Sequence, residues 1–282
     1  SPEDYSGKIL MIMVNDPPAT ADEPGLFGGK ALTYYGRWTY KFEEAARRGA
    51  AGVILIHTTE SAGYGWNVVR TSNGNWRYEI GRTATDKTPF LQVKSWMTNE
   101  TASRMLKLAG LNIEELRANA AKRGSKPVKT GIKVKLGLKS ELKTFDSPNV
   151  VGQIDGSDAK LKSEFVIYSG HWDHLGIGEP NASGDKIYNG AYDNASGVAA
   201  ILGIADVIAK LPRKERPKRS IMFFFPTAEE QGLLGAEFYS KNPLVPLDKT
   251  AANVNIDGVN FFGKVSDFMP LGADRSSMIS FV

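Results

Sequence analysis

The chain has 282 residues, of which 41% are hydrophobic and 23% charged, and its formal net charge is +4. This length accommodates about two domains, no apolar run is long enough to span a membrane, and the two basic runs (122–143 and 213–219) lack the interleaved aromatic residues typical of nucleic-acid binding. The chain has no cysteine, so thiolate nucleophiles, disulfides and cysteine-rich zinc sites are excluded, and any metal has to be held by His, Asp or Glu.

The first half of the chain predicts buried strands that alternate with amphipathic helices. Strands are expected at 8–14, 53–58 and 89–93, and helices at 37–48, 99–109 and 113–122. The helix at 37–48 is indicated by Trp38, Phe42 and Ala45, which recur on one face, and Gly49 is expected to end it. Thr98 is expected to cap the helix that follows it. The glycine- and aromatic-rich stretch 61–81 predicts a loop.

The second half predicts a more regular alternation. The lysine-rich stretch 126–142 has strand character. After it, strands are expected at 149–154, 164–170, 220–225 and 252–257, and helices at 195–211 and 231–240. Strands that alternate with helices favour an α/β sheet that is parallel at least in part. We place the domain boundary near 125–140, which gives domains of residues 1–130 and 131–282.

Acidic and imidazole side chains recur where the predicted strands of the second half end. Two of the chain's three histidines lie in the segment SGHWDHLG, directly after the strand at 164–170. Glu229 and Glu230 follow the strand at 220–225, Asp257 ends the strand at 252–257, and Asp193 precedes a helix. The carboxyl ends of parallel strands share one edge of a sheet, which is where α/β proteins bind ligands. We therefore expect these residues in one site.

Taken singly, most of these residues have a simpler structural explanation. Asp193 is placed as a helix N-cap, the glutamate pair complements a helix dipole, and Asp257 suits a turn. The recurrence of all of them at one type of position favours a site, because helix dipoles explain neither the histidine nor Asp257. His57 is expected to be a packed structural residue. The aromatic residues at 34–38 are expected to form core and the start of a helix, with lining of the pocket as the alternative.

Residue types suggest roles at this site. In an extended backbone, residues two apart point to the same side, so His171 and Asp173 suit a metal-bound imidazole held by a carboxylate. Glu229 and Glu230 would repel each other unless a metal binds one and leaves the other as a general base. His174 is expected to face away from His171 and to serve the structure of the loop.

The segments SGHWDHLG, NGAYDNASG, TAEEQGLLGA and NVNIDGVN, in this order, resemble the di-zinc aminopeptidases of the M28 peptidase family over residues 145–282. KILMIMVND and YYGRWTYKFEEAARRGAAGVILIHT resemble the protease-associated domain found in exported members. The resemblance implies a mixed, largely parallel sheet with helices on both faces, plus a smaller α/β domain. It also implies a periplasmic or secreted protein, although no signal peptide is visible at the start of the chain.

The resemblance implies two zinc ions, with cobalt or manganese as alternatives. Asp193 would bridge them, His171 and Asp257 would complete one site, and Glu230 would bind the other. Glu229 would be the general base that activates the bridging water, and Asp173 would orient His171. The implied function is an aminopeptidase acting on peptides with a free N-terminus. The alternatives are a non-catalytic, receptor-like homologue and a single-zinc enzyme similar to glutaminyl cyclase, and the intact set of ligands favours the peptidase.

The sequence departs from the family pattern at one position. The family's second metal takes a further histidine late in the domain, and no histidine follows His174 in this chain. The chain is therefore expected to be C-terminally incomplete. With only Asp193 and Glu230 at the second site, it is expected to hold at most one metal tightly.

Overall fold

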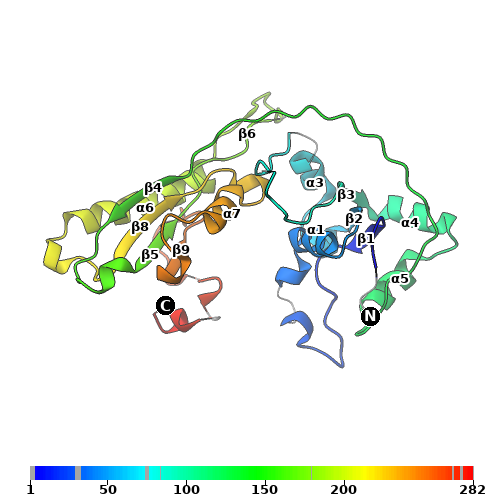
Figure 1. Cartoon of the computed structure of the whole chain (residues 1–282), viewed down its shortest axis with the longest axis horizontal. Coiled ribbons are helices and arrows are strands. Elements are labelled where there is room, and N and C mark those ends of the chain that lie inside the picture. Colours follow the sequence, from blue (N-terminus) through cyan, green and yellow to red (C-terminus); the bar gives the residue numbers. More distant parts are fainter. Residues whose placement is uncertain are drawn as a thin grey trace. The chain divides into compact units, whose positions relative to one another are not determined.

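The computed structural model describes residues 4–28, 33–73, 76–82, 84–178, 180–268, 270–273 and 276–281. The chain divides into two compact units, one of residues Ser1–Arg77 and Gly81–Lys143, the other of residues Tyr78–Ile80 and Thr144–Val282. In Figure 1 the first unit runs from blue to green and the second from green to red.

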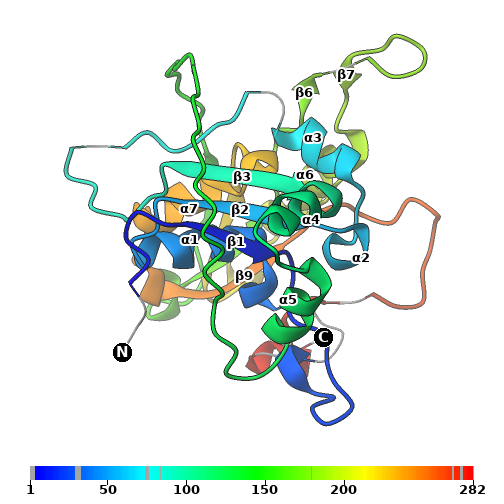
Figure 2. The same cartoon turned by 90° about the vertical axis from the view of Figure 1, so that its right-hand side faces the viewer.

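The first unit is built on a parallel three-stranded sheet in the order β1-β2-β3, seen side by side in Figure 2. Its elements are β1 (Ile9–Met13), α1 (Trp38–Arg47), β2 (Gly52–His57), α2 (Thr59–Ala62), α3 (Trp66–Asn73), β3 (Val93–Thr98), α4 (Asn99–Leu108) and α5 (Ile113–Ala120). The central strand β2 is buried along its whole length. Val53 and Leu55 pack with the α1 side of the core, and Ile56 packs with α4 and α5 on the other side.

Two elements of this unit differ from the prediction. The stretch 61–81, predicted as a loop, contains the end of α2 and all of α3. Thr58 caps α2 by accepting a hydrogen bond from the amide of Ser61, and α3 buries the side chain of Val69. β3 begins at Val93, where the predicted strand at 89–93 ends, since pairing with β2 starts at Val93 opposite Gly52. The predicted strand begins at a proline, which cannot donate a ladder hydrogen bond, and Phe90 after it is 64% exposed.

His57 has a structural environment, as predicted. Its side chain is buried, and Nε2 lies 2.9 Å from the carbonyl oxygen of Tyr64. Its ring packs against the rings of Trp66 and Trp96.

The segment 126–142 does not form the predicted strand. Residues 125–149 carry no helix or strand, and most of their side chains are exposed. An alternating pattern needs a partner strand to become a sheet, and no strand of the described chain pairs with this segment.

The second unit contains a four-stranded sheet in the order β4-β8-β5-β9 (Figure 1). β8 and β9 both run parallel to β5, and β4 runs antiparallel to β8. The elements are β4 (Val150–Ile154), β5 (Phe165–Ser169), β6 (Gly176–Ile177), β7 (Ile187–Tyr188), α6 (Gly197–Lys210), β8 (Ser220–Phe225), α7 (Leu234–Lys241) and β9 (Thr250–Asn255). Short helical turns lie at Leu26–Gly28, Tyr34–Gly36, Leu161–Ser163, Ala191–Ser196, Arg213–Glu215, Glu229–Gln231, Leu247–Lys249 and Ser277–Phe281.

Strand β8 shows how this sheet is covered on both faces. Ile221, Phe223 and Phe225 pack with Ile201 of α6, whereas Met222 and Phe224 pack with Tyr239 of α7. Each such buried side chain contributes about 1.5–3 kcal/mol to folding. The mixed α/β fold with helices on both sheet faces is thus confirmed. Among the described residues, no helix has the length and apolar character needed to cross a bilayer.

Candidate metal centre

The parallel strands β5, β8 and β9 bring the predicted site residues to one edge of the sheet. His171 lies two residues after β5, Glu229 and Glu230 lie in the turn that follows β8, and Asp257 lies two residues after β9. Asp193 comes from the turn Ala191–Ser196 that leads into α6. Because the carboxyl ends of parallel strands point the same way, the topology alone places these segments together.

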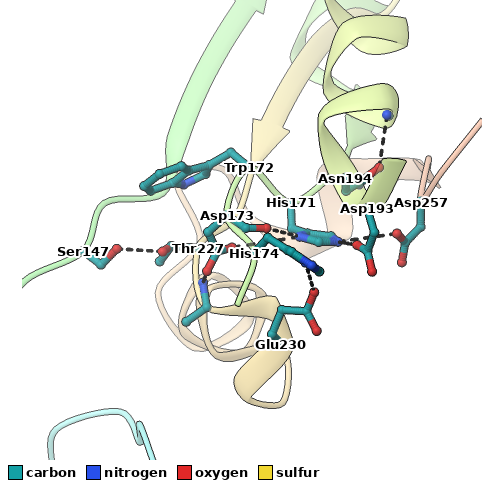
Figure 3. Close-up of polar contacts among 12 residues, drawn as sticks. Ser147, His171, Trp172, Asp173, His174, Asp193, Asn194, Thr227, Glu230 and Asp257 are labelled. Atoms are coloured by element: carbon teal, nitrogen blue, oxygen red, sulfur yellow. Dashed lines mark hydrogen bonds and ion pairs between the residues drawn. The ribbon is translucent and has the colours of Figure 1, made fainter. Parts of the chain in front are cut away.

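His171 is the buried centre of the first group of candidate ligands. Its side chain is 2% exposed, and its Nδ1 lies 2.9 Å from the carbonyl oxygen of Asp173. A carbonyl only accepts hydrogen bonds, so Nδ1 carries a proton, and Nε2 offers a lone pair to a metal when the ring is neutral. Nε2 lies 3.0 Å from Oδ1 of Asp193 and 3.4 Å from Oδ1 of Asp257 (Figure 3).

This arrangement fits a metal ion. Within the described part of the chain, Nε2 of His171 is buried without a hydrogen-bond partner, and a metal cation beside it would also be stabilised by the two carboxylates that it faces. Donors that bind zinc at about 2.0–2.1 Å in tetrahedral geometry lie about 3.3–3.4 Å apart, close to the distances from Nε2 to the two carboxylates. The three residues can therefore hold a metal.

A second group consists of His174, Asp193 and Glu230, and each residue offers a donor atom within 4.8 Å of the others. Nδ1 of His174 lies 2.6 Å from Oε1 of Glu230 (Figure 3). From the sequence, His174 was expected to face away from His171 and to serve the structure of the loop. That expectation assumed strand alternation, but β5 ends at Ser169, so the alternation does not extend to His174.

The carboxylate of Asp173 has a different partner from the one predicted. His171 is held by the main-chain oxygen of Asp173, whereas Oδ1 of Asp173 lies 4.0 Å from Nδ1 of the ring. Oδ2 of Asp173 instead accepts a hydrogen bond of 2.7 Å from the amide of Ala228, which has a left-handed φ of 54°. Asp173 thus ties the loop after β5 to the turn that carries Glu229 and Glu230.

Asn194 is a site residue whose role was not predicted from the sequence. It is 2% exposed, and its Nδ2 donates to the carbonyl oxygen of Ile256 at 2.9 Å. Its Oδ1 accepts from the amides of Gly197 at 3.1 Å and Gly258 at 2.9 Å. The side chain therefore fixes Asp193 relative to Asp257. The only sign of this role in the sequence is that Asn194 directly follows the candidate ligand Asp193.

The carboxylates around the buried ring shift the pKa values of the site. Burial alone would lower the pKa of His171, but the hydrogen bond to Asp173 and the charges of Glu229, Asp257 and Asp193 raise it. Burial raises the pKa of Glu229, and His171 opposes this rise while Glu230, Asp257 and Asp193 add to it. Negative charge is thus concentrated at this edge of the sheet.

Comparison with known proteins points to one peptidase family. Residues 149–282 match the family described as Peptidase family M28. The chain is 36% identical to mouse aminopeptidase NAALADL1 over 137 residues, which is 48% of this chain and 16% of the mouse protein. It is 29% identical to carboxypeptidase Q of Xenopus laevis over 232 residues, 79% of this chain and 44% of the frog protein.

The chain is also similar to a vacuolar membrane protease and to a solved peptidase structure. A vacuolar membrane protease of Lodderomyces elongisporus is 32% identical over 120 residues, 43% of this chain and 11% of that protein. Among solved structures, the peptidase M28 precursor of Shewanella amazonensis is 23% identical with a TM-score of 0.35, over 90% of this chain and 46% of that one. The chain thus spans less than half of each of these relatives.

Proposed function

We propose that the second unit, whose residues 149–282 match Peptidase family M28, is the catalytic part of a metal-dependent aminopeptidase. The observation that carries this proposal is the buried Nε2 of His171, which faces Asp193 and Asp257 without a hydrogen-bond partner among the described residues. A metal cation bound between this ring and the two carboxylates would offset the cost of burying these polar atoms together. The peptidase names of the relatives agree with a hydrolytic role.

Two zinc ions are the proposed cofactors, with cobalt or manganese as alternatives. His171, Asp193 and Asp257 would hold one ion, and Asp193 and Glu230 would hold the other, which makes Asp193 the shared ligand. When bound, such ions polarise the scissile carbonyl and make water more acidic. Asp193 and Asp257 have side chains that are 49% exposed, so a substrate can reach this edge of the sheet.

Glu229 is the proposed general base. It precedes Glu230 in the turn Glu229–Gln231, and its carboxyl is partly buried among the other acidic side chains. Burial raises its pKa, which brings its proton affinity closer to that of a base working near neutral pH. Its carboxylate would take a proton from the attacking water and pass it to the departing amine. Asp173 would act as a positioning residue, since its main-chain oxygen holds the ring of His171.

The first unit is proposed to be a protease-associated domain, and the protein is proposed to act outside the cytoplasm. Both statements rest on the resemblance of the segments around α1 and β2 to exported peptidases. Fractionation of cells that express the full-length protein tests the location: recovery only in the cytoplasm would contradict it.

The similarity to carboxypeptidase Q over 79% of this chain supports a second candidate, cleavage at the carboxyl end. Peptides blocked at one end distinguish the two. With the full-length protein, we expect hydrolysis of peptides that have a free amino group, blocked or free at the carboxyl end, and none of amino-acetylated peptides. Hydrolysis of acetylated peptides alone would replace the aminopeptidase with a carboxypeptidase.

Metal dependence is tested by removing the metal and by removing a donor. Chelation should abolish hydrolysis and added zinc should restore it. Asp257→Asn should weaken zinc binding, whereas Asp206→Asn, a control that removes an exposed carboxylate of α6 paired with Lys210, should not. Full hydrolysis after complete removal of metal would contradict the proposal.

A further inference from the structure

We propose that His174 supplies the nitrogen ligand of a second cation-binding group, so that these 282 residues offer three donors at each of two groups that share Asp193. This inference deepens the proposed function and rests on it for the identity of the metal. The first group is His171, Asp193 and Asp257, and the second is His174, Asp193 and Glu230. The expectation of at most one tightly held metal counted only two donors at the second group.

The positions of His174 and Glu230 support the proposal. Nδ1 of His174 and Oε1 of Glu230 are 2.6 Å apart, and the two side chains are 21% and 20% exposed. Both are thus partly withdrawn from water while they point toward each other (Figure 3). Partly buried donors are held in place better than exposed acidic groups, which lie together on many protein surfaces without binding metal.

Close packing against Gly190 independently fixes His174 next to Asp193. A Cβ atom at position 190 would lie 2.7 Å from the Cβ of His174 and 3.0 Å from the main-chain oxygen of Asp193. Gly190 also has a left-handed φ of 66°. The turn that carries Asp193 therefore approaches His174 as closely as a residue without a side chain allows.

The hydrogen bond between Asp173 and Ala228 holds Glu230 close to His174. Asp173 directly precedes His174, and Ala228 lies two residues before Glu230. The bond of 2.7 Å between the Asp173 carboxylate and the Ala228 amide thus joins the loop of the histidine to the turn of the glutamate. His174, Asp193 and Glu230 are held together by contacts that do not involve a metal.

The chemistry of this donor set suits zinc. Asp193, Glu230 and Asp257 supply carboxylate oxygens next to the imidazole nitrogens of His171 and His174. One imidazole and two carboxylates per ion, with an open position, is a set of donors of the kind found in catalytic zinc sites. Without His174, the second group would have two protein donors, whereas a catalytic zinc site normally has three.

Nuclear magnetic resonance on the whole 282-residue chain tests this proposal directly. The chain is labelled with ¹⁵N-histidine, depleted of metal and titrated with ¹¹³Cd²⁺ as a probe for zinc. A one-bond ¹¹³Cd–¹⁵N coupling arises only from a direct metal–nitrogen bond. The chain has three histidines, so three pairs of ring signals are expected. We expect coupling at Nε2 of His171 and Nδ1 of His174, and none at His57, the internal control. Coupling at His171 without coupling at His174 at saturation would overturn the proposal.

Affinity measurements on folded variants separate a ligand from a neighbour that only positions Glu230. Loss of an outer hydrogen-bond partner typically weakens metal binding about 10–100-fold. We expect His174→Ala to weaken the second equivalent of zinc more than about 100-fold and to leave the first equivalent within a few-fold, with an unchanged far-ultraviolet circular dichroism spectrum. Gly190→Ala should weaken the second equivalent as well. An unchanged second equivalent in His174→Ala would contradict the proposal.

The outcomes also separate this proposal from the proposed function. Two metals bound through both histidines without any hydrolysis by the full-length protein would contradict the peptidase and leave the role of His174 intact. Hydrolysis by a protein in which only His171 binds metal would contradict the role of His174 and leave the peptidase intact.

Discussion

At the scale of single residues, the ring of His171 organises the site. Its Nδ1 is occupied by the main-chain oxygen of Asp173, which fixes the tautomer and aims Nε2 at Asp193 and Asp257. The sequence predicted the pairing of positions 171 and 173 but attributed it to the Asp173 carboxylate. The alternation of side chains predicts which side of a strand each residue faces. It applies only within a strand, and β5 ends at Ser169. The same limit explains why the contact between His174 and Glu230 was not predicted.

Glu229 should reduce the stability of the metal-free chain at neutral pH. Burial raises its pKa, so in the range above the unfolded pKa of about 4.3 the folded chain binds more protons than the unfolded chain, and the free energy of unfolding falls as pH rises through the folded pKa. We expect Glu229→Gln to raise Tm in chelator at pH 7 and to leave it nearly unchanged at pH 4. Thermal melts across this range measure the effect. Glu237→Gln, which alters the exposed pair with Lys241, serves as control, and an equal Tm difference at both pH values for Glu229→Gln would refute the account.

Asn194 should couple folding to metal affinity. Asn194→Ala removes one donor and one acceptor from a buried site, and each group left unsatisfied costs about 1–3 kcal/mol. Without the hydrogen bonds of Asn194, Asp193 and Asp257 would no longer be held next to each other, so the site should bind zinc about 10–100-fold more weakly. Denaturant unfolding and zinc titration measure the two effects. Asn242→Ala, which removes an exposed hydrogen bond to the carbonyl of Phe238, should change neither property much. Wild-type zinc affinity in Asn194→Ala would show that Asn194 does not position the ligands.

At the scale of elements, the start of α7 is packed tightly against the turn that carries the glutamate pair. A Cβ at Gly235 would lie 2.4 Å from Oδ1 of Asn149 and 2.5 Å from the main-chain oxygen of Thr227. Asn149 in turn bonds to the amide of Thr227 and the carbonyl of Gly235. The position of Glu229 and Glu230 thus depends on a close contact between backbones.

Two glycine-to-alanine changes in helices should therefore act in opposite directions. Gly235→Ala should cost about 1–3 kcal/mol, because backbone atoms have to move, and it should weaken zinc binding. Gly203→Ala in α6 meets nothing within 4 Å and should raise stability by about 0.5–1 kcal/mol with zinc binding unchanged. Denaturant unfolding of both variants measures this. Equal effects of the two changes would contradict the close packing at Gly235.

The sequence predicted the long helices and most strands of both units because their apolar residues follow regular periods. It misplaced β3 and predicted a strand at 126–142 that does not form. It did not predict α3, which is short and lies between glycine-rich stretches, or the pair β6 and β7, whose strands have two residues each. Such short elements have too few residues to show a clear apolar period in the sequence, although α3 does bury Val69. The site residues could be predicted because parallel strands end at one edge, whereas Asn194 acts through three hydrogen bonds that no spacing reveals.

At the scale of the whole molecule, the exposed segment 126–143 connects two units that each have their own core. Its lysines are exposed and lie outside any helix or strand, which favours proteolysis. We expect limited trypsin treatment to cut first within 126–143, before the basic turn Arg213–Glu215, and we expect the nicked chain to keep its zinc. Mass spectrometry and metal analysis on the unseparated digest measure both. First cuts inside α1 or α6 would contradict the division into units.

The proposed active site of a metal-dependent peptidase lies at the edge formed by β5, β8 and β9, where Glu229 would take the proton from water. The most direct test measures zinc content and hydrolysis of an aminoacyl-nitroanilide on one preparation of the full-length protein carrying Glu229→Gln. The account predicts unchanged zinc content and a loss of turnover of about 10²–10⁴-fold, because the amide cannot accept the proton. Unchanged turnover at full zinc content would contradict it.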